Sequence, residues 1–226
     1  MFRMYSSLLL LVLSCFAMGA QTVPSVQANG NATLTAKPDQ AQLDVGVVTN
    51  GTTAQDASQQ NASLSNTVQG ALSKILGSAG TLQTVSYYVT PRYSNSPNQP
   101  STIVGYTASN ATRVTTTDLS QIGLLIDVAN QAGANSVGGL SFGLQNPEPL
   151  VEQALTLATK IATAHAAAIA AGLGGKVGAV LSAQEGSSYA PMAVGVANAG
   201  AAVTTPVQTG TVTVYATVTI QVGLAQ

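Results

Sequence analysis

The residues that could carry out chemistry are few and widely dispersed. The chain has one histidine, His165, and one cysteine, Cys15. Three carboxylates, Asp39, Asp44 and Asp56, lie near the start of the chain. Two carboxyl groups can do acid–base work when they face each other across roughly 5–10 Å. Turn and helix-capping positions already account for Asp39 and Asp56, so this spacing does not predict an active site.

The remaining motifs are also poor matches to known catalytic or metal sites. His165 lies in an alanine-rich segment, where a lone imidazole is more often a structural residue, and the chain has no Gly-x-Ser-x-Gly motif. The run Gly172-Leu173-Gly174-Gly175-Lys176 lacks the Lys-Ser/Thr pair of a phosphate loop and predicts a helix end instead. Metal sites need clustered His, Cys, Asp or Glu. The sequence therefore predicts no catalytic, cofactor-binding or metal-binding residues, no cofactor and no enzyme.

The composition argues against a nucleic-acid partner. Only 7% of the residues are charged and the formal net charge is -1, although 46% of the residues are hydrophobic. Binding to the phosphate backbone requires a basic surface. The exterior must therefore consist mainly of small and uncharged polar side chains.

The N-terminus has the pattern of a secretory signal. Arg3 precedes an apolar run from Leu8 to Leu13, and small residues follow up to Ala20. We expect residues 1–20 to be a signal peptide cleaved near Ala20, which predicts a periplasmic or secreted protein. Val12-Leu13-Ser14-Cys15 also fits a lipoprotein box, so a lipid anchor at Cys15 is the alternative. No transmembrane span is expected in the mature chain.

Periodicity predicts an α+β fold, with antiparallel β-sheets packed with about three helices, a long Ala-rich third helix and a C-terminal strand. Strands are expected at 26–36, 41–47, 82–90, 102–116, 137–144, 176–185 and 211–222. The first two are expected to form a hairpin around Lys37-Pro38-Asp39. Helices are expected from Thr53 to Gly77, from Thr117 to Gly133, and from Asn146 to Gly172. One side of the third helix is predicted to be Leu150, Ala154, Leu157, Ile161, Ala164 and Ala168.

The mature part, residues 21–226, is expected to be one domain, with two subdomains, about 24–116 and 117–226, as a further possibility. Residues 186–209 contain no charge and are rich in Ala, Gly, Val and Pro. We interpret them as a flexible loop, or alternatively as a surface that packs against a second subunit.

Several motifs follow one another along the chain: Gly30, Lys37-Pro38-Asp39-Gln40-Ala41, Thr53-Ala54-Gln55-Asp56-Ala57, Asn61, Tyr88, Pro91, Tyr93, Gly105-Tyr106-Thr107-Ala108-Ser109-Asn110, Asp118-Leu119, Ala132-Gly133-Ala134, Phe142 and Ala171-Gly172-Leu173-Gly174. Their joint order resembles the SIMPL-domain family, which includes periplasmic immunogenic proteins. The resemblance implies a periplasmic or secreted protein with a role in envelope or oxidative-stress tolerance. It also implies ring-like or channel-like oligomers in some members, and it implies no catalytic residues. Where relatives carry charges along the long helix, this chain has Thr159, Thr163 and Ala166 to Ala168 around Lys160.

We therefore expect a non-enzymatic envelope protein that forms a homo-oligomer through strand edges and residues 186–209. Two alternatives stay open. One is a small-molecule-binding module with a pocket between sheet and helices, and the other is a hydrolase with an unrecognised site at His165.

Overall fold

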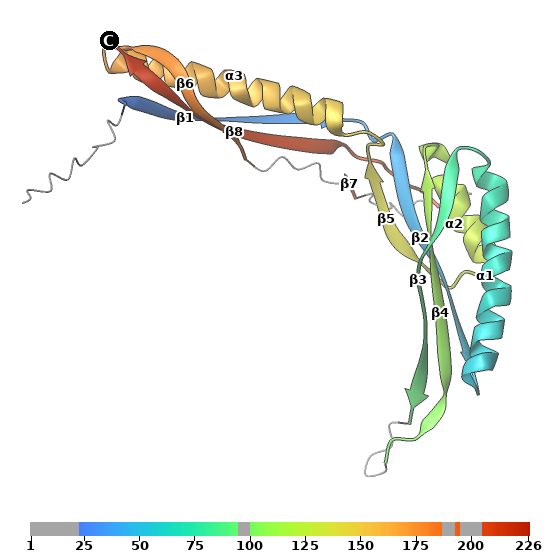
Figure 1. The fold of residues 1–226 in the computed structure, drawn as a ribbon. Coiled ribbons are helices and arrows are strands. Elements are labelled where there is room, and N and C mark those ends of the chain that lie inside the picture. Colours follow the sequence, from blue (N-terminus) through green and yellow to red (C-terminus); the bar gives the residue numbers. More distant parts are fainter. Residues whose placement is uncertain (1–22, 95–99, 187–192, 195–204) are drawn as a thin grey trace, which may run out of the picture.

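The computed structural model describes residues 23–94, 100–186, 193–194 and 205–226. This part of the chain forms a three-stranded and a five-stranded antiparallel sheet, joined at an angle (Figure 1). One helix covers a face of the three-stranded sheet, and two helices cover a face of the five-stranded sheet. The α+β class predicted from the sequence is confirmed. The elements are β1 (Ser25–Ala36), β2 (Gln40–Gly51), α1 (Ala54–Leu76), β3 (Gly80–Tyr93), β4 (Ile103–Thr116), η1 (Leu119–Gln121), α2 (Ile122–Gln131), β5 (Ser136–Gly143), α3 (Glu148–Gly172), β6 (Lys176–Glu185), β7 (Ala193–Val194) and β8 (Val212–Ala225).

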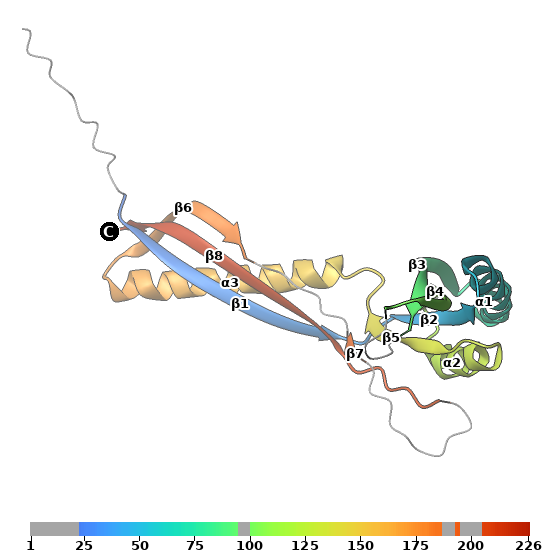
Figure 2. The same ribbon diagram turned by 90° about the horizontal axis from the view of Figure 1, so that it is seen from below.

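The three-stranded sheet has the order β1-β8-β6 and carries α3 on one face (Figure 2). β1 and β8 pair from Ser25 opposite Gly223 to Ala36 opposite Val212, without a break in register. Alternate residues of β8 are buried, as the period of two predicts: Val212, Val214, Ala216, Val218, Ile220 and Val222. Polar side chains pair on the opposite face, where Thr219 Oγ1 donates to Asn29 Oδ1 at 2.8 Å.

The buried side of α3 is a row of alanines four residues apart. The fully buried members are Ala154, Ala158, Ala162, Ala166 and Ala170. The face predicted from the sequence is therefore largely wrong, because Leu157, Ala164 and Ala168 point to solvent and only Ala154 is fully buried. The physical reason is the short distance between α3 and the sheet at Gly30, which leaves room for methyl groups only.

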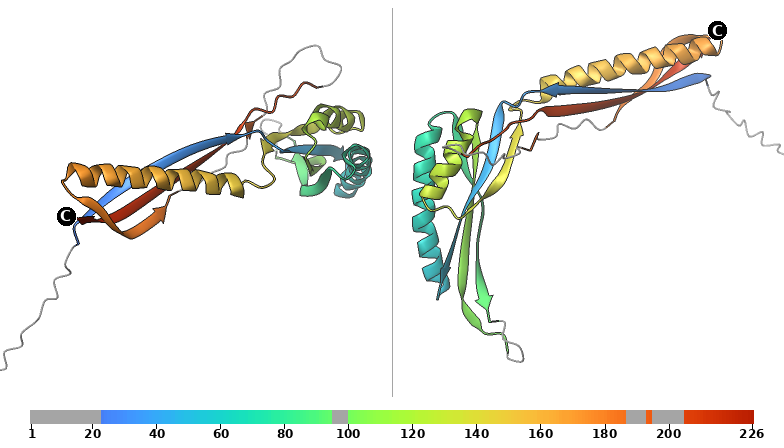
Figure 3. Two further views of the ribbon diagram at one scale, coloured as in Figure 1. Left: turned by 90° about the horizontal axis from the view of Figure 1, so that it is seen from above. Right: turned by 180° about the vertical axis from the view of Figure 1, so that it is seen from behind.

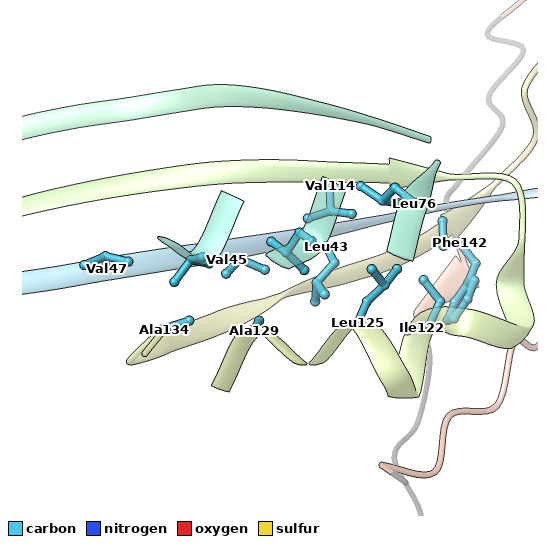
Figure 4. Packing of buried hydrophobic residues seen from close by; sticks show 13 residues of the cluster. Leu43, Val45, Val47, Leu76, Val114, Ile122, Leu125, Ala129, Ala134 and Phe142 are labelled. Atoms are coloured by element: carbon cyan, nitrogen blue, oxygen red, sulfur yellow. The ribbon is translucent and has the colours of Figure 1, made fainter. Parts of the chain in front are cut away.

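The five-stranded sheet has the order β3-β4-β2-β5-β7, with α1 and α2 side by side on one face (Figure 3). Its core joins Leu43 and Val45 of β2 to Leu76 of α1, Leu125 of α2 and Phe142 of β5 (Figure 4). The predicted opening hairpin is wrong, because β1 pairs with β8 while β2 pairs with β4 and β5. The alternation of buried and exposed residues in β1 and β2 agrees with the prediction. Alternation within a strand, however, does not identify the strand with which it pairs.

The helix starts follow the predicted caps. Thr53 Oγ1 accepts a hydrogen bond from Asp56 N at 3.1 Å, and Gly77 ends α1 with a φ of 51°. The second helix begins with η1, where Asp118 Oδ1 accepts from Ser120 N. The hydrogen bond from the Ser120 side chain is the main cause that lowers the pKa of Asp118 below its ordinary value. Gly133, with a φ of 105°, follows α2 as predicted.

Replacing Thr53 with alanine should lower the free energy of unfolding by about 1 kcal/mol, because the first turn of α1 loses its side-chain acceptor. Denaturant unfolding followed by circular dichroism measures this loss. Thr52→Ala is the matched control, since Thr52 contacts Asp56 through its backbone NH. An equal loss in both variants would contradict the capping role of Thr53.

The segment between β6 and β8 is described only in part. Most of the interpreted loop 186–209 lies outside the described residues. Its described parts contact the five-stranded sheet and the helix α2 that covers it: Ala193 pairs with Phe142 of β5, and Thr205 Oγ1 donates to Asp127 Oδ1 of α2 at 2.7 Å. The signal peptide at 1–20, the cleavage near Ala20 and the lipid anchor at Cys15 also lie outside the described residues and stay predictions.

Candidate interaction surface

The three carboxylates considered from the sequence each have a separate structural contact. Asp39 Oδ1 accepts from Gln145 N at 2.7 Å, which ties the β1–β2 connection to the end of β5. Asp56 Oδ1 accepts from Gln60 Nε2 at 2.9 Å in the first turns of α1. Asp44 lies within β2 and is paired with Arg113. The structure thus assigns these carboxylates to turns, a helix start and a strand.

Asp44 and Arg113 form a bidentate ion pair that the sequence did not predict. Arg113 Nε lies 2.8 Å from Asp44 Oδ1, and Arg113 Nη2 lies 2.9 Å from Asp44 Oδ2. The hydrogen bond and the charge of Asp44 raise the pKa of Arg113. The two residues are opposite each other in the β2–β4 register. Residues this far apart in the chain give no local signal, so only the strand pairing reveals the contact.

His165 is held by the main chain of the neighbouring strand. Its Nδ1 lies 2.9 Å from the carbonyl oxygen of Asn29 in β1, and the side chain is exposed. No hydroxyl or carboxyl group within the described ranges hydrogen-bonds to this ring. This contact fits the structural role expected for His165.

The glycine run after α3 is the turn into β6. Leu173 N donates to Ile169 O, and Gly174 has a φ of 77°, which favours glycine. This geometry is a helix end, as predicted. Among the described residues, no group of three or more His, Cys, Asp or Glu side chains is placed to hold a metal ion.

Two open hollows lie on the surface of the described chain. One, of about 370 Å³, follows the outer side of α3 between Pro149 and Lys160. The other, of about 420 Å³, lies at the end of the five-stranded sheet, where Gly80, Thr115 and Gln145 line it. Both hollows lie on the surface of the protein, while the small-molecule alternative expects a pocket between a sheet and its helices. That alternative stays a prediction.

α3 is long and apolar enough to cross a membrane by length and composition. Its alanine row is buried against β1 and β8. The opposite side of the helix, which carries Leu157 and Ile169, is exposed. The absence of a membrane span in the mature chain stays a prediction.

Exposed apolar side chains occur in several places, including α3, and two of these places include edge strands of the sheets. The first is the hairpin arm, which we define as residues 85–93 of β3 and 103–106 of β4. Its tip extends past the end of α1 (Figure 1). Its exposed apolar side chains are Val85, Tyr87, Tyr88, Tyr93, Ile103 and Val104. The second region is β6, where Val180 and Leu181 are exposed. Uncovered apolar surface of this kind commonly marks an interaction site.

The sequence is similar to a family model and to several known proteins. Residues 26–222 match the family SIMPL, described as a protein of unknown function (DUF541). A 26 kDa periplasmic immunogenic protein of Brucella melitensis is 30% identical over 156 residues, which cover 66% of this chain and 62% of the relative. The protein of the same name from Brucella abortus is 31% identical over the same shares. An uncharacterized protein YggE of Edwardsiella ictaluri is 27% identical over 162 residues, 70% of this chain and 66% of that protein. The chain thus spans less than two thirds of the length of the Brucella relatives.

Proposed function

Because the chain belongs to the SIMPL family, we propose that it is a non-enzymatic periplasmic protein that works by assembling with copies of itself. Its role would lie in envelope or oxidative-stress tolerance, as the resemblance to the family implies. The proposal joins three parts: location, mode of action and absence of catalysis. Each part has its own support.

The periplasmic location is supported by the names of the two Brucella relatives and by the N-terminal pattern around Arg3 and Leu8 to Leu13. Cys15, the only cysteine, precedes Ala20 and is removed with the signal if cleavage occurs there. The mature fold would then be stabilised without disulfides in an oxidising compartment. The two buried cores of the described chain are consistent with that.

Self-assembly is supported by the uncovered apolar surface, and this observation carries the proposal. The hairpin arm and β6 expose tyrosine, valine, leucine and isoleucine side chains on two different sheets (Figure 1). The tip of the arm, residues 92–93 and 103–105, extends beyond β2, because Gly51 at the end of β2 lies opposite Tyr106. Contact with a second copy would cover this apolar surface. Such a contact does not depend on ion pairs, and only 7% of the residues of this chain are charged.

The absence of catalysis is supported by the contacts of the residues that could do chemistry. His165 contacts a main-chain carbonyl group, and Asp44 is paired with Arg113. These contacts stabilise strands and helices and do not converge on a common reaction centre. The hydrolase alternative would require His165, so any hydrolytic activity that His165→Ala retains in full would exclude that residue as its catalytic group.

The test of self-assembly is the molar mass of the exported, processed protein, measured by light scattering coupled to size exclusion at several concentrations. We expect a discrete multiple of the monomer mass. A monomer at every concentration, including the highest, would contradict the proposal. In that case a ligand screen by melting temperature tests the small-molecule alternative, because a ligand that binds only the folded state raises the melting temperature.

A further inference from the structure

The outer side of α3 is a helix face that no other element of the described chain covers. Glu152, Thr156 and Lys160 follow one another along it at intervals of four residues, on the side opposite the buried alanine row, and all three are exposed. They line the hollow of about 370 Å³, and every residue that lines this hollow belongs to α3. Figure 3 shows α3 on the outer side of the three-stranded sheet. A partner could therefore reach this face without displacing any part of the described fold.

Two opposite charges on this face have no partner within the described chain. Glu152 and Lys160 lie about 12 Å apart along the helix axis, which is too far for an ion pair within α3. Neither side chain forms an ion pair with another described residue. The other residues that line the hollow are uncharged: Pro149, Gln153, Thr156 and Leu157. The face thus presents one negative and one positive charge on either side of an uncharged centre.

This order of charges is complementary to itself in the antiparallel direction. Thr156 lies midway between Glu152 and Lys160. If a second α3 packs antiparallel with a twofold axis at Thr156, Glu152 of each copy lies opposite Lys160 of the other. Parallel helices in register would instead place like charges opposite each other. The charges therefore favour a second copy in the antiparallel arrangement.

The uncharged centre of this face suits the same arrangement. Thr156 is small, so two helices can approach closely where they cross at this residue. Leu157 follows it directly and is 40% exposed. A twofold axis keeps the same flank of both helices on one side of the contact, so the two Leu157 side chains would meet there and leave water. Exposed ion pairs add little binding free energy, so the apolar contact would supply most of it and the charges would set the direction and register.

We propose that α3 packs antiparallel against α3 of a second copy, with the twofold axis at Thr156. This inference rests on the proposed self-assembly and adds one of its interfaces. The contact is isologous, so each copy contributes the same helix face. It leaves the hairpin arm and β6 uncovered, and both remain available for contacts in a larger assembly.

Disulfide cross-linking tests the position of the axis. A residue on a twofold axis lies opposite itself, so two Thr156→Cys chains can form a disulfide with each other. Ala168→Cys is the matched control, because Ala168 is exposed in the same row of α3 but would lie about 36 Å along the axis from its equivalent in the second copy. After mild oxidation of the exported, processed proteins, we expect a cross-linked dimer from Thr156→Cys and none from Ala168→Cys. The unmodified chain gives the background, because Cys15 is its only cysteine.

Two charge variants test the complementarity. Glu152→Lys has two positive charges on this face and Lys160→Glu has two negative ones, so each variant should repel its own copies. We expect roughly threefold to tenfold weaker self-association of each at low salt. Mixing the two variants restores opposite charges at both pairs, so chains with different tags should associate with each other more tightly than with themselves.

The outcomes separate this inference from the proposed function. A discrete oligomer in which Thr156→Cys does not cross-link, and in which the charge variants show no preference for each other, would overturn the α3 contact and leave self-assembly standing. Equal cross-linking of Thr156→Cys and Ala168→Cys would overturn the antiparallel arrangement. A monomer in the light-scattering measurement would overturn both proposals. Cross-linking at Thr156 alone, together with preferential mixing of the charge variants, would establish the contact.

Discussion

Replacing Asn61 with leucine should lower the free energy of unfolding by about 2–4 kcal/mol, because two buried carbonyl groups would lose their donor. Asn61 lies on α1 and is fully buried. Its Nδ2 donates to Val47 O at 2.7 Å and to Ala108 O at 3.1 Å, so one side chain ties α1 to both β2 and β4. Urea unfolding followed by far-UV circular dichroism measures the loss.

Asn66→Leu is the matched control for this variant. Asn66 lies on the same helix and is exposed, so the same substitution there removes no buried hydrogen bond. We expect a change within about 0.5 kcal/mol. An equal decrease at both positions would show that leucine destabilises α1 in general, and the proposed role of Asn61 would then be wrong.

Asn61 also shows what the sequence could and could not predict. It belongs to the motif set that resembles the SIMPL family, and it lies in the same row of α1 as Ala57, Ser65 and Val68, which are buried. A polar residue in a core row is a signal for a buried hydrogen bond. Its acceptors, however, come from two strands that are distant in the sequence, and periodicity does not identify them.

The elements themselves were predictable because each depends on local chemistry. Thr53 and Asp118 start helices, and the alternation around Val212 to Val222 gives a strand whose buried face was identified correctly. The pairing of strands was not predictable in the same way. β1 finds its partner in β8, near the other end of the chain, instead of in β2 beside it. Whether the chain divides into subdomains at about 24–116 and 117–226 stays a prediction.

The candidate interaction surface shows the same limit. Residues 176–185 were predicted as a strand, and the structure has β6 with these bounds. β6 is exposed because α3 packs mainly against β1 and β8. The buried face of α3 predicted from the sequence is largely wrong, so the exposure of β6 did not follow from the sequence. The predicted contact surface at 186–209 lies mostly outside the described residues, whereas the apolar side chains of β6 and of the hairpin arm became apparent only in the folded chain.

The close contact between α3 and β1 leads to the second large effect. Gly30 lies beneath α3, and a Cβ atom at this position would lie 1.9 Å from Ala158 O and 2.5 Å from Ala162 N. Backbone atoms cannot move aside individually, so Gly30→Ala must shift the whole helix away from the sheet. We expect the free energy of unfolding to fall by about 3 kcal/mol, at the upper end of the range for overpacked cores. Denaturant unfolding measures this change.

Gly70→Ala is the control with the opposite expected sign. Gly70 lies within α1, and a Cβ atom there would meet nothing within 4 Å. Alanine is the better helix former, so this variant should gain about 0.5–1 kcal/mol. The same substitution thus separates the effect of close packing from the general effect of replacing glycine.

A second readout locates the effect of Gly30→Ala at the contact itself. His165, the only histidine, contacts Asn29 O next to Gly30, so we expect a single set of imidazole signals in the NMR spectrum of the untagged protein. If α3 moves away from β1, this hydrogen bond lengthens and the His165 signals shift in Gly30→Ala but not in Gly70→Ala. Loss of stability without a shift of these signals would mean that the alanine is accommodated by β1 instead, and that α3 is not held against the strand at Gly30.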